Sequence, residues 1–326
     1  MVKYKVIKDS GLDFIEIETP FLKTTLCNLG ASIYSIIFDG KYMTLTPKNV
    51  DDFKLINIYH GKTIGRVSNR IKGNCVTIEG KKYYIENNEG ENTLHGGYDG
   101  ISTKTFNYHI FEKENEFDVV FDYISPNLES GFPGNLTLKV TYSISLLEAK
   151  IRIYFEATTD KDTMCSLTNH AYFCLGSKSI RKMSLQIPSS YYVDVNPLDL
   201  IAVEKKEVPS YLDFRTPKPI MLDIENEVLK NSRTNGYDHY FYFDVINPST
   251  PSITIFNTKY QMDIKTDFGG TQIYSDNWPD DFEFFTPRDP NYRGLAIEPS
   301  ETHLEEHILH KGEKYSHFIS YCFKKK

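Results

Sequence analysis

The sequence predicts an all-β protein, a sandwich or a barrel, from three observations. Apolar and polar residues alternate over many short segments, which is the period of a half-buried strand. Turn-forming residues separate these segments, and helical periodicity is weak. Strands do not alternate with helices along the chain, which disfavours a parallel sheet with crossover helices.

The clearest strand is predicted over residues 135–145, where an apolar residue occupies every second position from Leu136 to Ile144. A second strand is expected to follow through Ile151 and Phe155. The same alternation recurs over residues 117–123.

Two hairpins and one short helix complete the local predictions. The first hairpin spans residues 76–85 and turns at Glu79-Gly80, and the second spans residues 253–264 and turns over 257–259. The best helical candidate covers residues 224–231. Helices are therefore expected to be few and short.

The domain organisation is predicted to be simple. The length of 326 residues allows about two domains, but no repeat, low-complexity linker or shift in composition divides the chain. The prolines at positions 197, 209, 217 and 279 are expected in loops within one body. We therefore expect residues 1–326 to form a single domain.

Composition and charge exclude several classes of protein. Aromatic residues make up 14% of the chain, whereas disordered chains are poor in them. The net charge of -7 disfavours a nucleic-acid partner, which would require a basic face, and a polybasic membrane contact. No apolar run approaches the about 18 residues of a membrane span. We expect neither nucleic acid nor a membrane as a partner.

The N-terminus and the cysteines predict a cytoplasmic location. Charged residues interrupt every short apolar run near the N-terminus, so no signal-peptide core is present there. The 5 cysteines are scattered and form no C-x-x-C pair, which disfavours a disulfide framework or a structural zinc site. Free thiols in a reducing compartment are the simpler interpretation.

Six segments depart from the strand pattern and concentrate glycine, asparagine, histidine, arginine and acidic residues. These segments are 65–71, 92–97, 168–173, 237–239, 272–274 and 296–299. They contain the residues that could carry chemistry.

Glu298 and His170 stand out among them. Glu298 lies in an apolar run, and burying a carboxylate is costly unless it is paired or functional. Alternation that leaves Glu298 on a solvent face explains the pattern equally well. His170 could be a general acid because the reference pKa of histidine is about 6.5. A half-buried histidine hydrogen-bonded at a strand end is the simpler interpretation of His170 alone.

Other residues have a functional and a structural interpretation. Two glycines follow His95 and allow a sharp turn that could aim its imidazole into a cleft, although an exposed loop histidine is simpler. Arg66 and Arg70 offer rigid forks of donors suited to a polyol or a carboxylate, and surface ion pairs are the alternative. Asp238 could accept bonds from neighbouring hydroxyls or form an Asx turn.

One stretch could bind a metal. Residues 303–307 spell H-x-x-E-H, and on a helix His303 and His307 would share one face and could bind zinc. The pattern is short, lacks an obvious third ligand and lies where helical signal is weak, so a charged surface segment is preferred. The glycine-rich motifs that hold nucleotides and the G-x-S-x-G elbow are absent from the sequence. We expect no metal and no cofactor.

Four motifs, in order along the chain, resemble those of one family. Residues 65–71 resemble G-R-x-x-N-R-I, residues 92–97 match N-x-L-H-G-G, residues 131–136 resemble G-[YF]-P-G-N-L, and residues 168–173 match T-N-H-x-Y-F. Together they make the sequence similar to the aldose 1-epimerase family, also called galactose mutarotases.

The resemblance implies a fold, an activity and a partner. The fold would be a large antiparallel β-sandwich, the galactose mutarotase-like supersandwich, with few short helices. The activity would be the interconversion of the α and β anomers of a free aldohexose, galactose or glucose, without a cofactor. The partner would be a small-molecule sugar, bound by a monomer or a homodimer.

The resemblance also implies roles by motif position. Glu298 would be the general base and His170 the general acid, which suits a reaction that takes a proton from the C1 hydroxyl and delivers one to the ring oxygen. Sugar hydroxyls or the ring oxygen would be contacted by Asn69, Arg70, His95, Tyr172, Asp238 and Gln272.

Two positions depart from the family pattern. Cys174 replaces a common asparagine and is expected to concern packing. Ser300 replaces a frequent glutamine, so a supporting hydrogen bond is expected to be missing.

Two alternative functions follow from the same motifs. A same-fold enzyme for a phosphorylated or uncommon sugar would need extra basic residues, which are not clustered near the motifs. A non-catalytic carbohydrate-binding protein would not need both Glu298 and His170.

Overall fold

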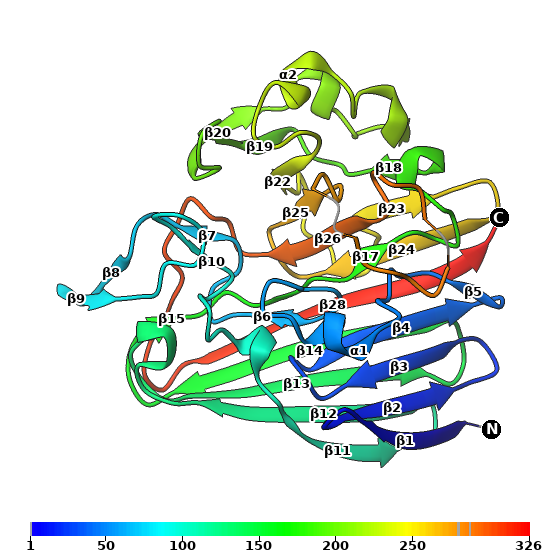
Figure 1. Ribbon diagram of the computed structural model, residues 1–326, viewed down its shortest axis with the longest axis horizontal. Helices are drawn as coiled ribbons and strands as arrows, with labels where there is room; N and C mark the ends of the chain where they lie inside the picture. The colour runs from blue at the N-terminus through cyan, green and yellow to red at the C-terminus, as the bar shows by residue number, and fades with distance from the viewer. Residues whose placement is uncertain (1, 279–280, 287) are drawn as a thin grey trace.

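The computed structural model describes residues 2–278, 281–286 and 288–326. In these ranges the strands form three larger sheets, of five, nine and six strands, and four two-stranded ribbons (Figure 1). All the pairs of named strands are antiparallel. The all-β prediction is confirmed.

The five-stranded sheet is an N-terminal meander in which each strand pairs with the next. In sheet order its strands are β1 (Lys3–Asp9), β2 (Leu12–Glu18), β3 (Lys23–Cys27), β4 (Ser32–Phe38) and β5 (Lys41–Tyr42).

The nine-stranded sheet combines the middle of the chain with its C-terminus. In sheet order its strands are β11 (Asn107–Glu112), β12 (Glu116–Ser125), β13 (Leu136–Ser145), β14 (Lys150–Thr159), β28 (Lys314–Lys325), β24 (Tyr260–Thr266), β23 (Ile253–Phe256), β18 (Ser184–Gln186) and β21 (Lys218–Pro219).

These two sheets pack face to face as a sandwich. Apolar side chains of β2, β3 and β4 share one buried core with those of β12, β13 and β14. The Tyr142 hydroxyl on β13 crosses this interface and donates a 2.6 Å hydrogen bond to the carbonyl oxygen of Ala31. The alternating residues of β13 from Leu136 to Ile144 are buried as predicted. Alternation therefore reports the face that each strand turns to the core.

The six-stranded sheet carries one wall of the candidate site and lies toward the top of the view in Figure 1. In sheet order its strands are β17 (Tyr172–Phe173), β26 (Leu295–Ser300), β25 (Gly270–Tyr274), β22 (Asp238–Tyr242), β19 (Tyr191–Val195) and β20 (Ala202–Glu207).

The two-stranded ribbons join distant segments or form local hairpins. They pair β6 (Thr63–Ile64) with β16 (Thr168–Asn169), β7 (Arg70–Ile71) with β10 (Thr93–Leu94), β15 (Thr163–Met164) with β27 (Ile308–Leu309), and β8 (Cys75–Ile78) with β9 (Lys81–Tyr84). The last ribbon is the first predicted hairpin, and β23 and β24 form the second.

Helices are few and short. The α-helices of the described residues are α1 (Val50–Lys54) and α2 (Glu227–Lys230), each capped by an asparagine side chain. The second lies inside the predicted range 224–231. The 3-10 helices are η1 (Ile101–Thr103), η2 (Glu129–Gly131), η3 (Ile180–Lys182), η4 (Ser210–Leu212) and η5 (Ile220–Leu222). None of the helices in the described ranges has the length and apolar character needed to cross a membrane.

The predicted loop prolines fall as expected where they can be checked. Residues 197, 209 and 217 lie between regular elements. The prediction at position 279 lies outside the described residues.

Candidate active site

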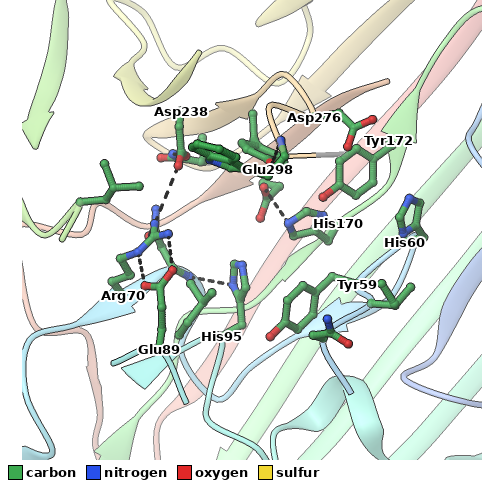
Figure 2. A pocket seen from close by; sticks show the side chains of 18 of the residues that line it. Tyr59, His60, Arg70, Glu89, His95, His170, Tyr172, Asp238, Asp276 and Glu298 are labelled. Atoms are coloured by element: carbon green, nitrogen blue, oxygen red, sulfur yellow. Dashed lines mark hydrogen bonds and ion pairs between the residues drawn. The ribbon is translucent and has the colours of Figure 1, made fainter. Parts of the chain in front are cut away.

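All eight residues to which the resemblance gives a role line one cavity of about 330 Å³ (Figure 2). They come from all six of the segments that interrupt the strand pattern. Their order in the chain is Asn69, Arg70, His95, His170, Tyr172, Asp238, Gln272 and Glu298. The fold therefore gathers residues separated by more than two hundred positions.

One wall is made by strand register in the six-stranded sheet. Gln272 on β25 pairs directly with Glu298 on β26 and with Tyr240 on β22. Asp238 lies two residues before Tyr240 and therefore shares its face. Gln272 Nε2 donates a 2.6 Å hydrogen bond to Asp238 Oδ1. Antiparallel pairing thus places an amide between two carboxyl groups.

The opposite wall comes from the ribbon of β7 and β10. The backbone N–H of His95 donates to the carbonyl oxygen of Asn69 over 3.0 Å. In return, the backbone N–H of Asn69 donates to Nδ1 of the His95 ring over 3.1 Å. Both residues have positive φ, 59° for Asn69 and 53° for His95. This reciprocal pair fixes the direction of the imidazole.

A glycine makes the turn after His95 possible. Gly96 has a φ of +86°, and a Cβ atom there would lie 2.1 Å from the carbonyl oxygen of Gly65. Only glycine satisfies both conditions. The interpretation of His95 as an exposed loop residue was wrong, because its side chain is buried and faces the cavity.

The centre of the site is the contact between His170 and Glu298. The distance between His170 Nε2 and Glu298 Oε1 is 3.3 Å (Figure 2). His170 is 4% exposed and Glu298 is 3% exposed. The interpretation that Glu298 faces bulk solvent is therefore wrong. His170 follows β16, whose pairing with β6 holds it against the site.

Burial disfavours the charged form of each partner in this pair. Burial lowers the pKa of His170 to about 4 and raises the pKa of Glu298 well above its ordinary value, with the nearby Asp238 raising it further. Between these two pKa values the pair therefore holds one proton. That proton can reside on the carboxyl group or on Nε2, and the 3.3 Å contact joins the two positions.

A charged cluster fixes Arg70 at one end of the cavity. The carboxylate of Glu89 accepts from Arg70 Nε over 2.6 Å and from Nη2 over 2.9 Å. Arg70 Nη1 lies 3.9 Å from Asp238 Oδ2. Burial alone would lower the pKa of Arg70, but the two carboxylates raise it above its usual value. Burial raises the pKa of Asp238, with Arg70 and Gln272 opposing that rise.

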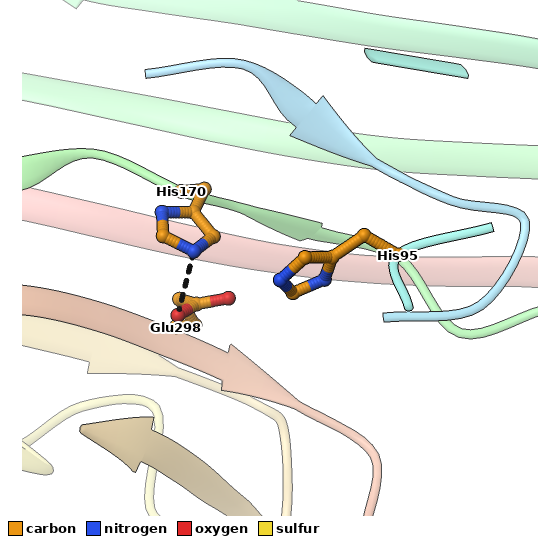
Figure 3. A group of neighbouring side chains, drawn as sticks. All are labelled: His95, His170 and Glu298. Carbon is orange, nitrogen blue, oxygen red and sulfur yellow. Dashed lines mark ion pairs between the residues drawn. The ribbon is translucent and has the colours of Figure 1, made fainter. Parts of the chain in front are cut away.

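The three groups His95, His170 and Glu298 converge closely enough to raise the question of a metal (Figure 3). Their candidate ligand atoms all lie within 4.8 Å of one another. However, the Asn69 N–H occupies the lone pair of His95 Nδ1, so the proton of the neutral ring is on Nε2. A histidine that binds a metal through one ring nitrogen normally donates a hydrogen bond from the second ring nitrogen. In His95 the second nitrogen, Nδ1, instead accepts a hydrogen bond, and the nitrogen on the cavity side carries the proton. His95 is therefore arranged as a hydrogen-bond donor.

Aromatic side chains complete the walls. Tyr172, the one aromatic that the motifs indicate, packs 5.0 Å from the His170 ring, and Tyr59 lies 5.7 Å from it. Tyr274 and Trp278 also line the cavity. Tyr274 could have been inferred, because it lies two positions after Gln272 on the same strand and therefore shares its face.

Several lining residues had no signal in the sequence. They are Asn57, Ile58, Tyr59, His60, Glu89, Leu200, Arg233, Asp276, Trp278 and Phe282, whereas Leu94 belongs to the motif of residues 92–97. Most lie in loops, where no period relates a side chain to a face of the sheet.

The comparisons with known proteins bear on this geometry. A family model described as aldose 1-epimerase matches residues 13–322. The chain belongs to the aldose 1-epimerase family. This is a family of isomerases, and the resemblance inferred from the motifs is confirmed.

Individual relatives of this epimerase family agree. The aldose 1-epimerase of Escherichia coli (strain K12) is 30% identical over 286 residues, which cover 81% of this chain and 79% of that protein. The galactose mutarotase of Bos taurus is 26% identical over 285 residues, with the same coverage.

Solved structures confirm the family fold. The galactose 1-epimerase of Lactobacillus acidophilus NCFM superposes with a TM-score of 0.88 at 22% identity, covering 100% of this chain and 99% of that one. An aldose epimerase homologue from C. elegans gives a TM-score of 0.82 at 22% identity, with the same coverage. The expected large antiparallel sandwich is confirmed.

Arg66 has a different place from Arg70 in this epimerase. Its side chain neither lines the cavity nor forms a surface ion pair with the described residues. Its guanidinium is buried and donates to the carbonyl oxygens of Ser125, Pro126, Pro133 and Gly134 at 2.8–3.0 Å. Two family motifs, 65–71 and 131–136, are therefore joined by this side chain, which holds the loop in place.

Asp238 is a strand residue. It begins β22, and its carboxylate accepts from Gln272 across the sheet. The interpretation of Asp238 as an Asx turn was therefore wrong.

The H-x-x-E-H residues form a turn and an irregular loop instead of a helix, so His303 and His307 do not share a helical face. The His303 ring packs against the Tyr240 ring, and the carbonyl oxygen of Thr302 accepts a 2.8 Å hydrogen bond from Nε2 of His307. The preferred interpretation, a charged surface segment, is correct only in part, because several of these side chains are half-buried.

The two departures from the family pattern have clear places. Cys174 is fully buried beside Leu45 and Tyr172, so the expectation of a packing role is confirmed. The Ser300 hydroxyl donates to the carbonyl oxygen of Glu298 over 3.3 Å. Its bond reaches the backbone of Glu298 and not the carboxyl group.

Proposed function

We propose that this epimerase interconverts the α and β anomers of a free aldohexose, galactose or glucose, by opening and reclosing the pyranose ring. Glu298 acts as the general base and His170 as the general acid. The observation that carries the proposal is the 3.3 Å contact between His170 Nε2 and Glu298 Oε1, buried in a cavity lined by hydroxyl-binding groups. A base and an acid this close can act on two oxygens bonded to the same carbon.

Ring opening moves one proton at each end of the C1–O5 bond. The Glu298 carboxylate takes the proton of the C1 hydroxyl, and the electron pair of that O–H bond forms the C1 carbonyl. The C1–O5 bond breaks, and its electron pair takes a proton from His170 Nε2. The products are the open-chain aldehyde, a neutral carboxyl group and a neutral imidazole.

Reclosure runs the same transfers backwards after rotation about C1–C2. His170 takes the proton of the C5 hydroxyl, that oxygen attacks C1 on the other face, and Glu298 returns its proton to the former carbonyl oxygen. The neutral pair that exists after ring opening is the form that burial favours. The pair therefore completes a cycle with one proton and needs no exchange with solvent.

Neighbouring side chains stabilise the negative charge that develops on the ring oxygen and bind the sugar hydroxyls. The Nε2–H of His95 is directed by Asn69 into the cavity, where it can stabilise negative charge on the ring oxygen. Asp238 and Gln272 supply acceptors and a donor for hydroxyl pairs, and Arg70 supplies a fixed fork. Tyr172 gives an aromatic wall.

The charge of the lining speaks against a phosphorylated sugar. The cavity contains the carboxyl groups of Glu89, Asp238, Asp276 and Glu298, but its arginines are Arg70 and Arg233. Glu89 pairs with both arginines, at 2.6 Å and 3.8 Å. Both arginines of the lining are therefore already paired with a carboxylate, and an anionic substituent would have to compete with Glu89 for them.

The remaining parts of the proposal concern the whole protein. We infer a single domain over residues 1–326, because one buried core contains side chains from Ile15 to Phe323. The five cysteines are free in the structure, which favours a location in the reducing cytoplasm. The protein is proposed to act as a monomer or a homodimer. No cofactor is required, because side chains supply the protons. Dialysis against a chelator is therefore expected to leave the rate unchanged.

The test is anomer exchange by NMR across a panel of free aldoses. The wild-type protein should accelerate exchange for galactose or glucose. Glu298→Gln and His170→Asn should each lose about 10²–10⁴-fold in kcat. Full activity in either variant would overturn the assigned role, and sugar binding without any exchange would favour a non-catalytic carbohydrate-binding protein.

A further inference from the structure

The two imidazoles of the proposed site stand nearly perpendicular to each other. The centroids of the His95 and His170 rings lie 5.2 Å apart, with 87° between the ring planes. One ring nitrogen of each lies within 4.8 Å of the other and of a Glu298 carboxyl oxygen (Figure 3). An oxygen atom about 2.9 Å from both nitrogens fits between them. The angle between the rings therefore decides whether the general acid and the donor reach the same atom.

A hydrogen bond to the second ring nitrogen orients only one of these imidazoles. Nδ1 of His95 accepts from the backbone N–H of Asn69 over 3.1 Å. Nδ1 of His170 is covered and has no hydrogen-bonding partner outside its own residue in the part of the chain that the structure describes. A catalytic imidazole is commonly held by a third group at that nitrogen. The contact of His170 Nε2 with Glu298 leaves the tilt of the ring open, so another contact sets it.

Ring packing supplies this contact. The His170 ring lies 5.0 Å from the Tyr172 ring and 5.7 Å from the Tyr59 ring. The Tyr59 ring also meets the His95 ring edge-on, with 4.7 Å between centroids and 64° between planes (Figure 2). Rings at these separations attract one another in tilted and edge-on arrangements. Tyr59 is thus in contact with both imidazoles at once.

The turn that carries Tyr59 is bonded to the backbone of His170. The N–H of Lys62 donates to the carbonyl oxygen of Tyr59 and closes the turn. The N–H of Gly61 donates to the carbonyl oxygen of His170, and the N–H of His170 donates to that of Lys62, both over 2.9 Å. A Cβ atom on Gly61 would lie 1.8 Å from the carbonyl oxygen of Ile33, so this close approach requires glycine. Tyr59 and His170 are therefore held together by main-chain bonds.

The ring of Tyr59, and not its hydroxyl, makes the contacts with the imidazoles. Within the described ranges, the hydroxyl of Tyr59 forms no hydrogen bond with another residue. Burial raises the pKa of Tyr59 to about 12, so the phenol stays neutral at physiological pH. A phenylalanine ring at this position would keep the same packing, whereas an aliphatic side chain would not.

We propose that Tyr59 is a positioning residue that holds the imidazoles of His170 and His95 at a right angle, so that both reach the ring oxygen of the sugar. Without the ring, His170 can turn about its side-chain bonds, and water can enter beside it. The consequence for catalysis rests on the proposed function. The packing itself belongs to the sugar-free protein and can be tested there.

The first test measures anomer exchange of galactose and glucose by NMR. Tyr59→Ala should lower kcat about 10–100-fold, because the reacting groups lose their alignment. KM should change less than about threefold, and Tyr59→Phe should keep kcat within about twofold of the wild-type value. Tyr84→Ala, at a position on β9 that is 73% exposed, is the matched control and should keep kcat.

Two results of this test would overturn the proposal. An equal fall of kcat in Tyr59→Phe and Tyr59→Ala would show that the hydroxyl, and not the ring, is required. A higher KM with unchanged kcat in Tyr59→Ala would make Tyr59 a wall that binds the sugar. If Tyr59→Ala fails to fold, Tyr59→Leu fills much of the same space without a flat ring, and its kcat should fall while that of Tyr59→Phe does not.

The second test follows the imidazole of His170 in the sugar-free protein. Heteronuclear NMR across pH gives the midpoint at which this ring gains a proton, and His170→Asn identifies its signals. Burial lowers the pKa of His170 to about 4. In Tyr59→Ala, water reaches the ring and the midpoint should rise toward about 6.5, whereas Tyr59→Phe should keep the wild-type midpoint. A purely structural role for Tyr59 predicts a lower Tm with an unchanged midpoint, which would refute the proposal.

The other titratable groups around His170 are the same in all these variants. They are Glu298 on β26, His95 after β10, Tyr172 on β17 and His60 in the turn. Because none of them is substituted, a shift of the midpoint reports the change at Tyr59. If the wild type exchanges no anomers, the proposed function fails, and the midpoint in Tyr59→Ala still decides whether Tyr59 holds His170.

Discussion

The backbone N–H of Asn69 donates a hydrogen bond to Nδ1 of His95 over 3.1 Å. This bond leaves the proton of the neutral His95 ring on Nε2, which faces the cavity. Burial, with His170 and Arg70 nearby, lowers the pKa of His95 well below its ordinary value, so the ring stays neutral. One main-chain bond thus sets both the tautomer and the direction of a donor in the proposed active site.

The first prediction concerns that donor. His95→Ala should lower kcat about 10²–10³-fold, because it removes a donor that stabilises charge on the ring oxygen. His95→Gln can place an amide N–H near the position of Nε2 and should retain more activity. NMR anomer exchange under saturating sugar provides the measurement. Equal loss in the two variants would contradict a role as donor.

The second prediction concerns pH. The active pair holds one proton, and activity is lost when the pair gains a second proton or loses its only one. Since burial lowers the pKa of His170 to about 4, the acid limb of kcat should lie near pH 4. Since burial raises the pKa of Glu298, the rate should fall on the alkaline side only as the pH rises through that raised value, well above the ordinary value of a glutamate.

The measurement for this second prediction is kcat against pH, after subtraction of the uncatalysed exchange. An acid limb near about pH 6.5, the ordinary value for histidine, would show that His170 titrates as an exposed imidazole. That result would contradict the shared-proton cycle.

The third prediction concerns the positioning of Arg70. Glu89→Gln removes the charge that holds the Arg70 fork at 2.6 Å and 2.9 Å. KM should rise about 3–10-fold with a smaller change in kcat, because the role proposed for Arg70 is to bind sugar hydroxyls away from the reacting atoms. Glu225→Gln breaks a comparable Arg–Glu pair at an exposed position and is the control. A fall in kcat with unchanged KM would show that Glu89 acts on the chemistry instead.

The fourth prediction concerns stability near the end of β26, the strand that carries Glu298. His317 lies 3.1 Å from Glu301 and 3.4 Å from Asp267. Burial would lower its pKa, but these two carboxylates raise the pKa of His317 to about 9. Because the folded value exceeds the unfolded one, this stabilisation is complete below about pH 6.5 and is lost as pH rises through about 9. The lowered pKa values of Asp267 and Glu301 also stabilise the fold, but their contribution has the opposite pH dependence. It is present at neutral pH and is lost as the pH falls through the two lowered pKa values.

Thermal unfolding of His317→Gln tests this at two pH values. The variant should be less stable than the wild type by about 1–3 kcal/mol near pH 6, and the difference should shrink near pH 10. His109→Gln removes a histidine whose side chain is 66% exposed and should change Tm little at either pH. A difference that persists undiminished near pH 10 would show that packing of His317, and not its charge, is responsible.

The sequence by itself determined the strands and the motifs, because both depend on residues close together in the chain. The alternation from Leu136 to Ile144 predicts a strand, because side chains in a strand repeat every two residues. The two glycines after His95 predict a sharp turn, because glycine tolerates positive φ. For the same reason, the motif that contains His170 could be identified without knowing what lies opposite it.

Only the tertiary structure decided which of these residues meet. Arg66 and Arg70 lie in one motif, yet one binds loop carbonyls and the other lines the cavity. Register between β25 and β26 brings Gln272 beside Glu298, and loop packing places His60 beside Tyr172. Contact across such distances depends on the packing of whole sheets, and no local period in the sequence records it.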